Sequence, residues 1–163
     1  MLLQIETTHR PATDIGYLLH KNPAGPQTFA VSFGSVHVFY PVAQEDRCRV
    51  CVLLDVDTVG LVRGRSEAAA DQYVNDRPYV ASSLLSVALN KLFASAMNGR
   101  SKERQSLVEQ PLPLKATITV IPTRGGADLC HRFFEPLGYA VTTDRHPLDE
   151  QYEGWGESPY CTL

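Results

Sequence analysis

The sequence predicts an α+β fold, in which a β-hairpin and further strands pack around one long amphipathic helix and a β-α-β group follows toward the C-terminus. Two observations predict it. One long segment has apolar residues at steps of three and four, as in a helix buried on one side, whereas the other apolar segments are short. We expect a domain over residues 1–110 and a second subdomain over 111–163, truncated because its last strand reaches the chain end.

The long helix is predicted over residues 80–98. Asp76 stands ahead of it as a cap, Pro78 suits a first helical turn, and Gly99 follows as a left-handed stop. One side is apolar, formed by Ala81, Leu84, Leu85, Ala88, Leu92 and Ala96 and widened by Leu89 and Phe93. This helix is therefore expected to form the centre of the core.

The segments before the long helix contain most of the predicted strands. We expect a strand over 2–6, a helix over 12–21 and a central strand over 50–54, whose continuous apolar run indicates cover on both faces. Between them, Gly34-Ser35 predicts a two-residue hairpin turn with glycine first. That turn pairs Phe33 with Val36, Val31 with Val38 and Phe29 with Tyr40, and Pro41 ends the second strand.

The segments after the long helix predict the β-α-β group. A strand is expected over 115–121 with Ala116, Ile118 and Val120 on one face, then a helix over 127–135 with Leu129 and Phe133 on one stripe. Strands over 139–143 and 159–163 follow. A short helical stretch over 67–73 is also expected between the central strand and the long helix.

Composition restricts the class of protein. The formal net charge of −3 argues against a general nucleic-acid binder and leaves room only for a local basic patch. Four cysteines are too few and too irregularly spaced for a disulfide framework. The first residues lack the pattern of a signal peptide, and no apolar run approaches the roughly 20 residues that span a bilayer. We therefore expect a cytoplasmic protein without membrane contact.

Two short constellations are candidates for metal chemistry. Asp55 and Asp57 share one face at a strand end, a spacing by which two carboxylates can hold a divalent metal against a phosphate. Turn capping, or an ion pair with Arg63 or Arg65, explains the same residues. Cys48, Cys51, Cys130 and His131 could supply four zinc ligands. Geometry argues against that set, because the first two point to opposite faces of a strand and the last two diverge on a helix.

Other polar groups have a simple structural explanation beside a functional one. His9, Arg10 and His20 lie near the ends of the predicted first helix and are either a catalytic pair or ordinary caps and surface groups. Arg124-Gly125-Gly126 precedes a helix and could bind an anion, although a glycine turn needs no ligand.

Basic residues gather just after the long helix. Contact with a partner or with RNA is predicted for Arg77, Arg100, Lys102, Arg104 and Arg124, which flank predicted helices. The alternative is that they form intramolecular pairs with Asp76, Glu103 or Glu109, or that the segment is a solvated loop.

Several blocks of the sequence resemble a known family. They are TTHRPATDIGYLLHKNP, SFGSVHVFYP, LLDVDTVGLVRGR, QYVNDRPYVASSLLSVALNKLF, GRSKER and RGGADLCHRFFEPLGY. Together they resemble the amino-terminal region of the bacterial 3′-terminal RNA ribose 2′-O-methyltransferases. The resemblance extends along essentially the whole chain.

The resemblance implies a role without methyl transfer for this chain. In that family a separate carboxy-terminal domain transfers the methyl group with S-adenosylmethionine and a divalent metal, and this sequence has no E-x-x-E-H cluster. The resemblance therefore implies a non-catalytic module without a cofactor. Its partner would be the ligase part of a bacterial polynucleotide kinase-phosphatase-ligase, which it would bind and activate, and RNA would be reached through the complex. A metal-dependent phosphotransfer or nucleotidyl-transfer enzyme using Asp55 and Asp57 is the alternative.

Overall fold

The computed structural model describes residues 1–59, 78–123, 126 and 128–163, and for 78–82 and 153 it describes the backbone alone. The ion-pair partners Arg63 and Arg65, the helix expected over 67–73 and the Asp76 cap lie outside these residues. Two compact units, Met1–Lys115 and Ala116–Leu163, are described separately below, and the expected division at residue 110 stays a prediction. Within the described residues, no helix has both the length and the apolar character needed to cross a membrane. The expected α+β class is confirmed.

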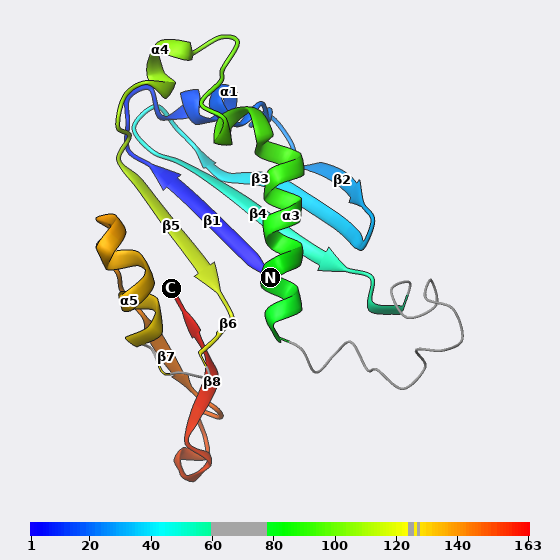
Figure 1. The fold of residues 1–163 in the computed structure, drawn as a ribbon, viewed down its shortest axis with the longest axis vertical. Helices are drawn as coiled ribbons and strands as arrows, with labels where there is room; N and C mark the ends of the chain where they lie inside the picture. Colours follow the sequence, from blue (N-terminus) through cyan, green and yellow to red (C-terminus); the bar gives the residue numbers. More distant parts are fainter. Residues whose placement is uncertain (60–77, 124–125, 127) are drawn as a thin grey trace. The chain divides into compact units, whose positions relative to one another are not determined.

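The first unit is built on an antiparallel sheet (Figure 1). Its strands are β1 (Leu2–Thr7), β2 (Gln27–Val31), β3 (Gly34–Ala43) and β4 (Cys48–Val56). The strand β5 (Leu114–Thr119), which begins in this unit and continues in the second, completes the order β2-β3-β4-β1-β5. β-branched side chains favour this extended conformation, and four fully buried valines form the core of the sheet. They are Val36, Val38, Val50 and Val52.

The central position of β4 is confirmed, but only one of its faces is fully covered. Alternate residues from Cys48 to Leu54 point to the same face, and all of them are buried. On the opposite face Cys51 is buried, whereas Leu53 is 38% exposed. The expectation of cover on both faces was therefore wrong for the end of the strand, because an apolar run does not show what packs against it.

The hairpin between β2 and β3 has a different register from the expected one. Phe29 pairs with Val36 and Val31 with Gly34, so that the loop is residues 32 and 33. Phe33 is 6% exposed and lies in this loop, where its backbone oxygen accepts a hydrogen bond from Asp57 N at 2.9 Å. The expected register was derived from the turn residues alone. It did not include the contact between this loop and the end of β4. Pro41 lies within β3, where the pairing with β4 is irregular, and does not end the strand.

The first helix is shorter than expected. A 3₁₀ turn over Ala12–Asp14 leads into α1 (Ile15–Leu19), and His20 ends the helix in the left-handed conformation with φ 53°. His20 N bonds to Tyr17 O at 3.3 Å and Lys21 N to Gly16 O at 3.0 Å, which closes the last turn. Lys21 is therefore outside the helix, and it is buried.

The long helix is α3 (Pro78–Met97), which lies in front of the sheet in Figure 1. Three of its predicted core residues, Leu85, Ala88 and Phe93, are buried, and Leu92 is half-buried. The helical geometry is interrupted at Phe93, with φ −123° and ψ 23°. The helix is thus confirmed, with a break near its end that its caps and stripe do not predict.

The second unit contains a small antiparallel sheet and one short helix. The strands β6 (Ile121–Pro122), β7 (Asp144–Pro147) and β8 (Glu157–Thr162) have the order β6-β8-β7, and α5 (Asp128–Phe134) continues into a 3₁₀ turn over Glu135–Leu137. Ile118 and Leu163, both within this unit, exchange backbone hydrogen bonds of 2.7 and 3.0 Å. The expected helix and last strand are confirmed.

Three local expectations for this unit were wrong. The strand over 115–121 is interrupted at Val120, which has φ 62° and is 58% exposed. Residues 139–143 form no strand, and the strand follows at β7. On α5 the buried residue is Cys130, whereas Phe133 is 63% exposed. In each case the apolar pattern of the segment does not show which other residues pack against it, and that packing decides burial.

Candidate functional site

The basic segment Arg100–Arg104 begins at a well-defined helix end. Gly99 has φ 66°, and its N–H bonds to Ala96 O at 3.0 Å. Arg100 N bonds to Ser95 O at 2.9 Å. These two bonds form a Schellman cap, which glycine favours because it has no Cβ to clash in the left-handed region. The left-handed stop is confirmed, and it fixes the direction in which the basic segment leaves α3.

Two polar side chains hold the segment to the short helix that follows, α4 (Gln105–Val108). Ser101 is 8% exposed, and its Oγ accepts a hydrogen bond from Arg104 N at 3.2 Å. In return, Gln105 Oε1 accepts one from Ser101 N at 2.9 Å, and Gln105 Nε2 donates to Gly99 O at 3.1 Å. This reciprocal arrangement resembles a capping box. The backbone carrying Arg100 and Lys102 is therefore ordered, while both side chains are exposed.

Arg104 connects the segment to α1. Its Nε donates to Asp14 Oδ2 at 3.0 Å, and the guanidinium lies 4.6 Å from the centre of the Tyr17 ring. Asp14 is 9% exposed, and its hydrogen bond is the main cause that raises the pKa of Arg104. The ion pair and the cation–π contact both fix the guanidinium. The intramolecular partner is thus Asp14, which was not among the acidic residues considered from the sequence.

Lys21 is a buried cation that connects α1 to α3. Its Nζ donates to Leu92 O at 3.0 Å, to His20 O at 3.3 Å and to Leu19 O at 3.4 Å. It also lies 5.1 Å from the ring centre of Phe29 and 5.4 Å from that of Phe93. Burial lowers its pKa by removing the ammonium group from water. The sequence does not indicate that Lys21 is buried, because a lysine next to a helix end is usually solvated.

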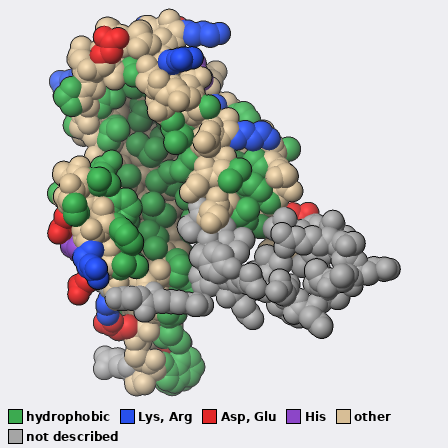
Figure 2. Space-filling model, in the orientation of Figure 1, with side chains coloured by type: hydrophobic (Ala, Val, Ile, Leu, Met, Phe, Trp, Pro, Cys, Tyr) green, Lys and Arg blue, Asp and Glu red, His purple; other side chains and the backbone are tan. Residues whose placement is uncertain are grey.

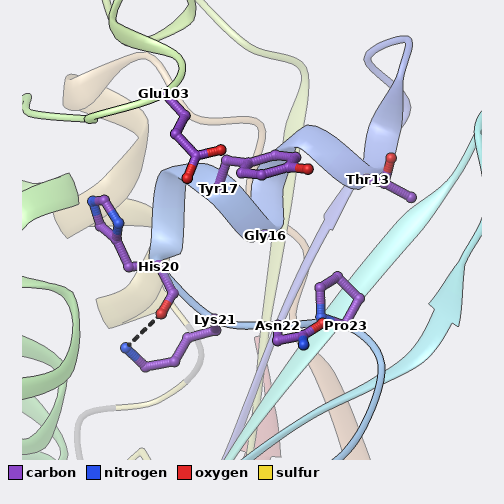
Figure 3. Close-up of a pocket in the computed structure, with 8 residues that line it drawn as sticks. All are labelled: Thr13, Gly16, Tyr17, His20, Lys21, Asn22, Pro23 and Glu103. Atoms are coloured by element: carbon purple, nitrogen blue, oxygen red, sulfur yellow. Dashed lines mark hydrogen bonds between the residues drawn. The ribbon is translucent and has the colours of Figure 1, made fainter.

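A cavity of about 500 Å³ lies against α1 (Figure 3). Tyr17, His20 and Glu103 surround one side of it, and Thr13, Asn22 and Pro23 lie along the other. His20, expected at a helix end, is exposed here, while His9 and Arg10 precede α1. Because Glu103 lines it, the cavity lies next to the basic segment Arg100–Arg104.

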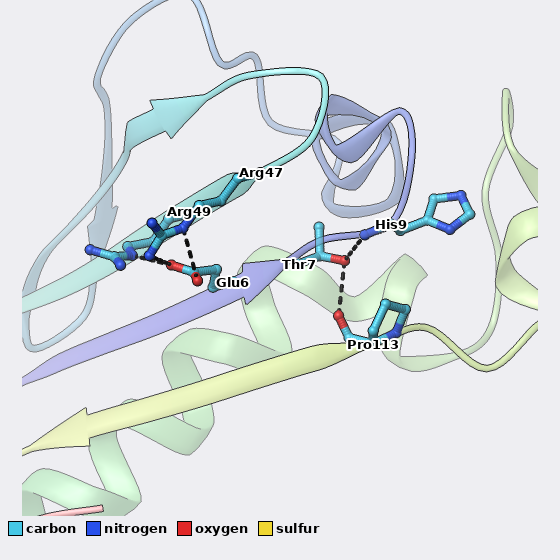
Figure 4. A network of polar contacts seen from close by, with 6 residues as sticks. All are labelled: Glu6, Thr7, His9, Arg47, Arg49 and Pro113. Carbon is cyan, nitrogen blue, oxygen red and sulfur yellow. Dashed lines mark hydrogen bonds and ion pairs between the residues drawn. The ribbon is translucent and has the colours of Figure 1, made fainter.

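Glu6, near the end of β1 that leads toward α1, forms a second ion-pair network (Figure 4). Glu6 Oε2 accepts hydrogen bonds from Arg49 Nε at 2.6 Å and from Arg47 Nη2 at 3.0 Å. The hydrogen bond from Arg47 is the largest cause that lowers the pKa of Glu6. Nearby, Thr7 Oγ1 donates to Pro113 O at 3.0 Å. These contacts tie β1 to β4 and to the segment before β5.

The residues considered for metal binding lie as follows. Asp55 and Asp57 are exposed at the end of β4, where Asp55 is opposite Ser35. Burial and, after it, the nearby Cys161 raise the pKa of the Cys130 thiol, and His131 Nδ1 pairs with Glu135 Oε1 at 2.7 Å. Over the described ranges, no three His, Cys, Asp or Glu side chains are arranged to hold a metal ion. Arg77, Arg124 and Gly125 lie outside those ranges.

These features define an α+β protein that presents an ordered, charged surface segment. A family model described as "RNA repair, ligase-Pnkp-associating, region of Hen1" matches residues 1–163, and the chain belongs to this family. The family confirms the resemblance found in the sequence and assigns the chain to RNA repair in association with the ligase and Pnkp. Among curated proteins, none matches the chain.

Proposed function

We propose that this chain binds the ligase associated with Pnkp and activates it for RNA sealing. The observation that carries the proposal is the family match over residues 1–163, whose description includes association with the ligase. Methyl transfer, with its S-adenosylmethionine and divalent metal, belongs to another part of Hen1 in this proposal. RNA is reached through the complex.

The surface proposed for contact is the exposed pair Arg100 and Lys102. The pair lies between the cap of α3 and the Ser101–Gln105 hydrogen bonds, so that its backbone loses little freedom when a partner binds. Cationic groups held in this way fit carboxylates of a partner protein. Arg104 is left out of this proposed pair, because its Nε already bonds to Asp14 and its guanidinium faces the Tyr17 ring.

The proposal is tested with Arg100→Ala/Lys102→Ala in the full chain. The affinity for the ligase, measured by isothermal titration calorimetry, is expected to fall roughly tenfold, since two exposed ion pairs contribute up to about 1 kcal/mol each. The weakening should diminish as salt rises. Ligase adenylylation and the sealing of a nicked RNA are measured in the same samples and should fall together with occupancy.

Lys115→Ala/Arg132→Ala is the matched control. It removes the same charge from two other exposed positions and should bind and stimulate the ligase like the parent chain. Circular dichroism of each variant verifies that it is folded. Equal behaviour of the parent chain and both variants would place the contact elsewhere, and a parent chain that neither binds nor stimulates the ligase would refute the proposed function.

The chain alone, given S-adenosylmethionine and an RNA with a free 3′ end, is expected to transfer no methyl group. Its sequence has no E-x-x-E-H cluster of the kind that holds the metal in the methyltransferase family. Incorporation of radiolabelled methyl above a no-protein control would contradict this assignment.

A further inference from the structure

The loop between β7 and β8, residues 148–156, exposes two stacked aromatic rings. Tyr152 and Trp155 have ring centres 5.0 Å apart and an interplanar angle of 16°. Tyr152 is 55% exposed and Trp155 62% exposed. Large aromatic side chains are usually buried, because an exposed ring leaves a large apolar surface in contact with water. A stacked and exposed pair is therefore a feature that needs an explanation.

The loop is ordered by its own contacts. At its base, Leu148 N bonds to Gly156 O at 2.9 Å, and Arg145 pairs with Glu157 at 2.7 Å. Within the loop, Gln151 N bonds to Asp149 Oδ1 at 2.7 Å and Trp155 N to Tyr152 O at 3.0 Å. The loop extends beyond the ends of β7 and β8 (Figure 1), and hydrophobic side chains are exposed there (Figure 2). The rings are thus held in place before any partner arrives.

Acidic residues surround the aromatic pair in the sequence. Residues 148–157 contain Asp149, Glu150, Glu153 and Glu157, and neither lysine nor arginine occurs among them. Glu150 is exposed and Asp149 is half-buried. Interfaces between proteins typically have a centre enriched in aromatic residues and a polar rim. An aromatic pair with an acidic rim therefore fits an apolar recess bordered by basic residues.

We propose that the β7–β8 loop is a docking element for the ligase, with the Tyr152–Trp155 pair inserted into an apolar recess that basic residues of the ligase surround. This inference rests on the proposed function, since the ligase is the partner that function supplies. The acidic loop would be a second contact with the ligase, in addition to the basic pair Arg100 and Lys102. The ligase acts on RNA, and a protein that binds a polyanion presents basic surface.

Charge decides against RNA as the direct occupant of this loop. Exposed aromatic rings also stack on single-stranded bases, but such sites combine the rings with positive charge along the backbone. Here every charged residue of loop 148–156 is acidic, and acidic side chains repel phosphates. The same acidic residues would attract a basic protein surface and speed its association.

Trp155 is the single tryptophan of the chain, and it gives a direct probe. The full chain is labelled with 5-fluorotryptophan, which yields one ¹⁹F resonance that reports on this ring alone. Unlabelled ligase is expected to shift or broaden the resonance at stoichiometric concentration. A single-stranded RNA oligonucleotide at the same salt concentration is expected to leave it unchanged.

Two variants measure the contribution of the loop to ligase affinity by calorimetry. Trp155→Ala is expected to weaken binding about 30-fold, as for an aromatic residue at the centre of an interface. Asp149→Asn/Glu150→Gln removes the charge but keeps the oxygen that accepts the Gln151 hydrogen bond. It is expected to weaken binding about fivefold and to reduce the salt dependence.

Each variant has a matched control. Phe133→Ala removes another aromatic ring that is 63% exposed in the same unit, and Glu45→Gln/Asp46→Asn neutralises two adjacent exposed acids in a turn of the first unit. Both should bind like the parent chain. Circular dichroism and the ¹⁹F linewidth of the free chain show whether the charge variant keeps its fold.

The outcomes separate this inference from the proposed function. If the parent chain binds the ligase while Trp155→Ala binds equally well and the resonance does not move, the loop is not a docking element and only this inference fails. A resonance that shifts with RNA and not with ligase also overturns it. If the parent chain does not bind the ligase at all, the proposed function fails and this inference with it.

Discussion

Replacing Lys21 by methionine tests the contact that joins α1 to α3. Methionine has a similar length and stays apolar, but it cannot donate a hydrogen bond. The variant leaves Leu92 O, His20 O and Leu19 O without the ammonium that bonds to them at 3.0, 3.3 and 3.4 Å. It also removes the cation that faces two phenylalanine rings.

The magnitude follows from these contacts. A hydrogen bond to a charged group contributes about 1.5–3 kcal/mol, and the bond to Leu92 O is the short one. The two longer bonds and the cation–π contacts add smaller amounts, whereas the variant no longer has to bury an ammonium group. We expect the free energy of unfolding to fall by about 1–3 kcal/mol. Urea unfolding followed by circular dichroism at neutral pH measures it.

The control is Lys91→Met on the exposed side of α3. Lys91 makes one hydrogen bond, from Nζ to Ala30 O at 3.0 Å. Because this bond is exposed and water competes for it, its loss should cost less than about 1 kcal/mol. Because burial lowers the pKa of Lys21, the unfolded chain binds this proton more tightly than the folded chain. The stability contribution of Lys21 should therefore rise with pH between its folded pKa and its unfolded value of about 10.4, and Lys21→Met should lack this rise. Equal stabilities of the two variants, with the same pH dependence, would refute the reasoning.

Three further substitutions test the core, the sheet ion pair and the hairpin. Leu85→Ala should lower the free energy of unfolding by about 2–5 kcal/mol, because Leu85 is only 5% exposed. Leu92 is half-buried, so Leu92→Ala should lower it less. Equal losses would show that burial does not determine the cost of the two substitutions. Glu6→Gln should be less stable than the parent chain at neutral pH. Because Arg47 lowers the pKa of Glu6, this difference is present above the unfolded pKa of about 4.3 and should shrink as the pH falls through the folded value; a constant difference in acid would contradict the assignment. Gly34→Ala should cost more than about 2 kcal/mol, because φ is 143° and the new Cβ would overlap the Asp55 backbone oxygen; an unchanged thermal midpoint would exclude this close approach.

Local chemistry explains which parts of the fold could be predicted from the sequence. The α3 helix and its end were predictable because glycine at the left-handed position and a periodic apolar stripe act over a few residues. The hairpin register was not, because Gly34 serves the close approach to β4 and not the turn itself. A pattern within one hairpin contains no information about a third strand.

The candidate site was predictable only in part, for a similar reason. The basic residues Arg100, Lys102 and Arg104 could be located from the sequence, but the Asp14 partner of Arg104 is distant in the chain and depends on how α1 packs. Lys21 showed no sign of burial, since lysine beside a helix end is normally solvated. The Tyr152–Trp155 pair was missed because its residues follow no helical or strand period.

Two contacts, made by residues on either side of α1, act on the same stretch of chain. Lys21 bonds to the carbonyl of Leu92 beside the break in α3, and Asp14 holds Arg104 at the other end of the connection to α4. Between these two points lie the Schellman cap and the exposed Arg100 and Lys102. A segment fixed at both ends loses less conformational entropy on binding than a free loop does. In the proposed function, loss of either α1 contact should therefore weaken ligase binding even though neither Lys21 nor Asp14 touches the ligase.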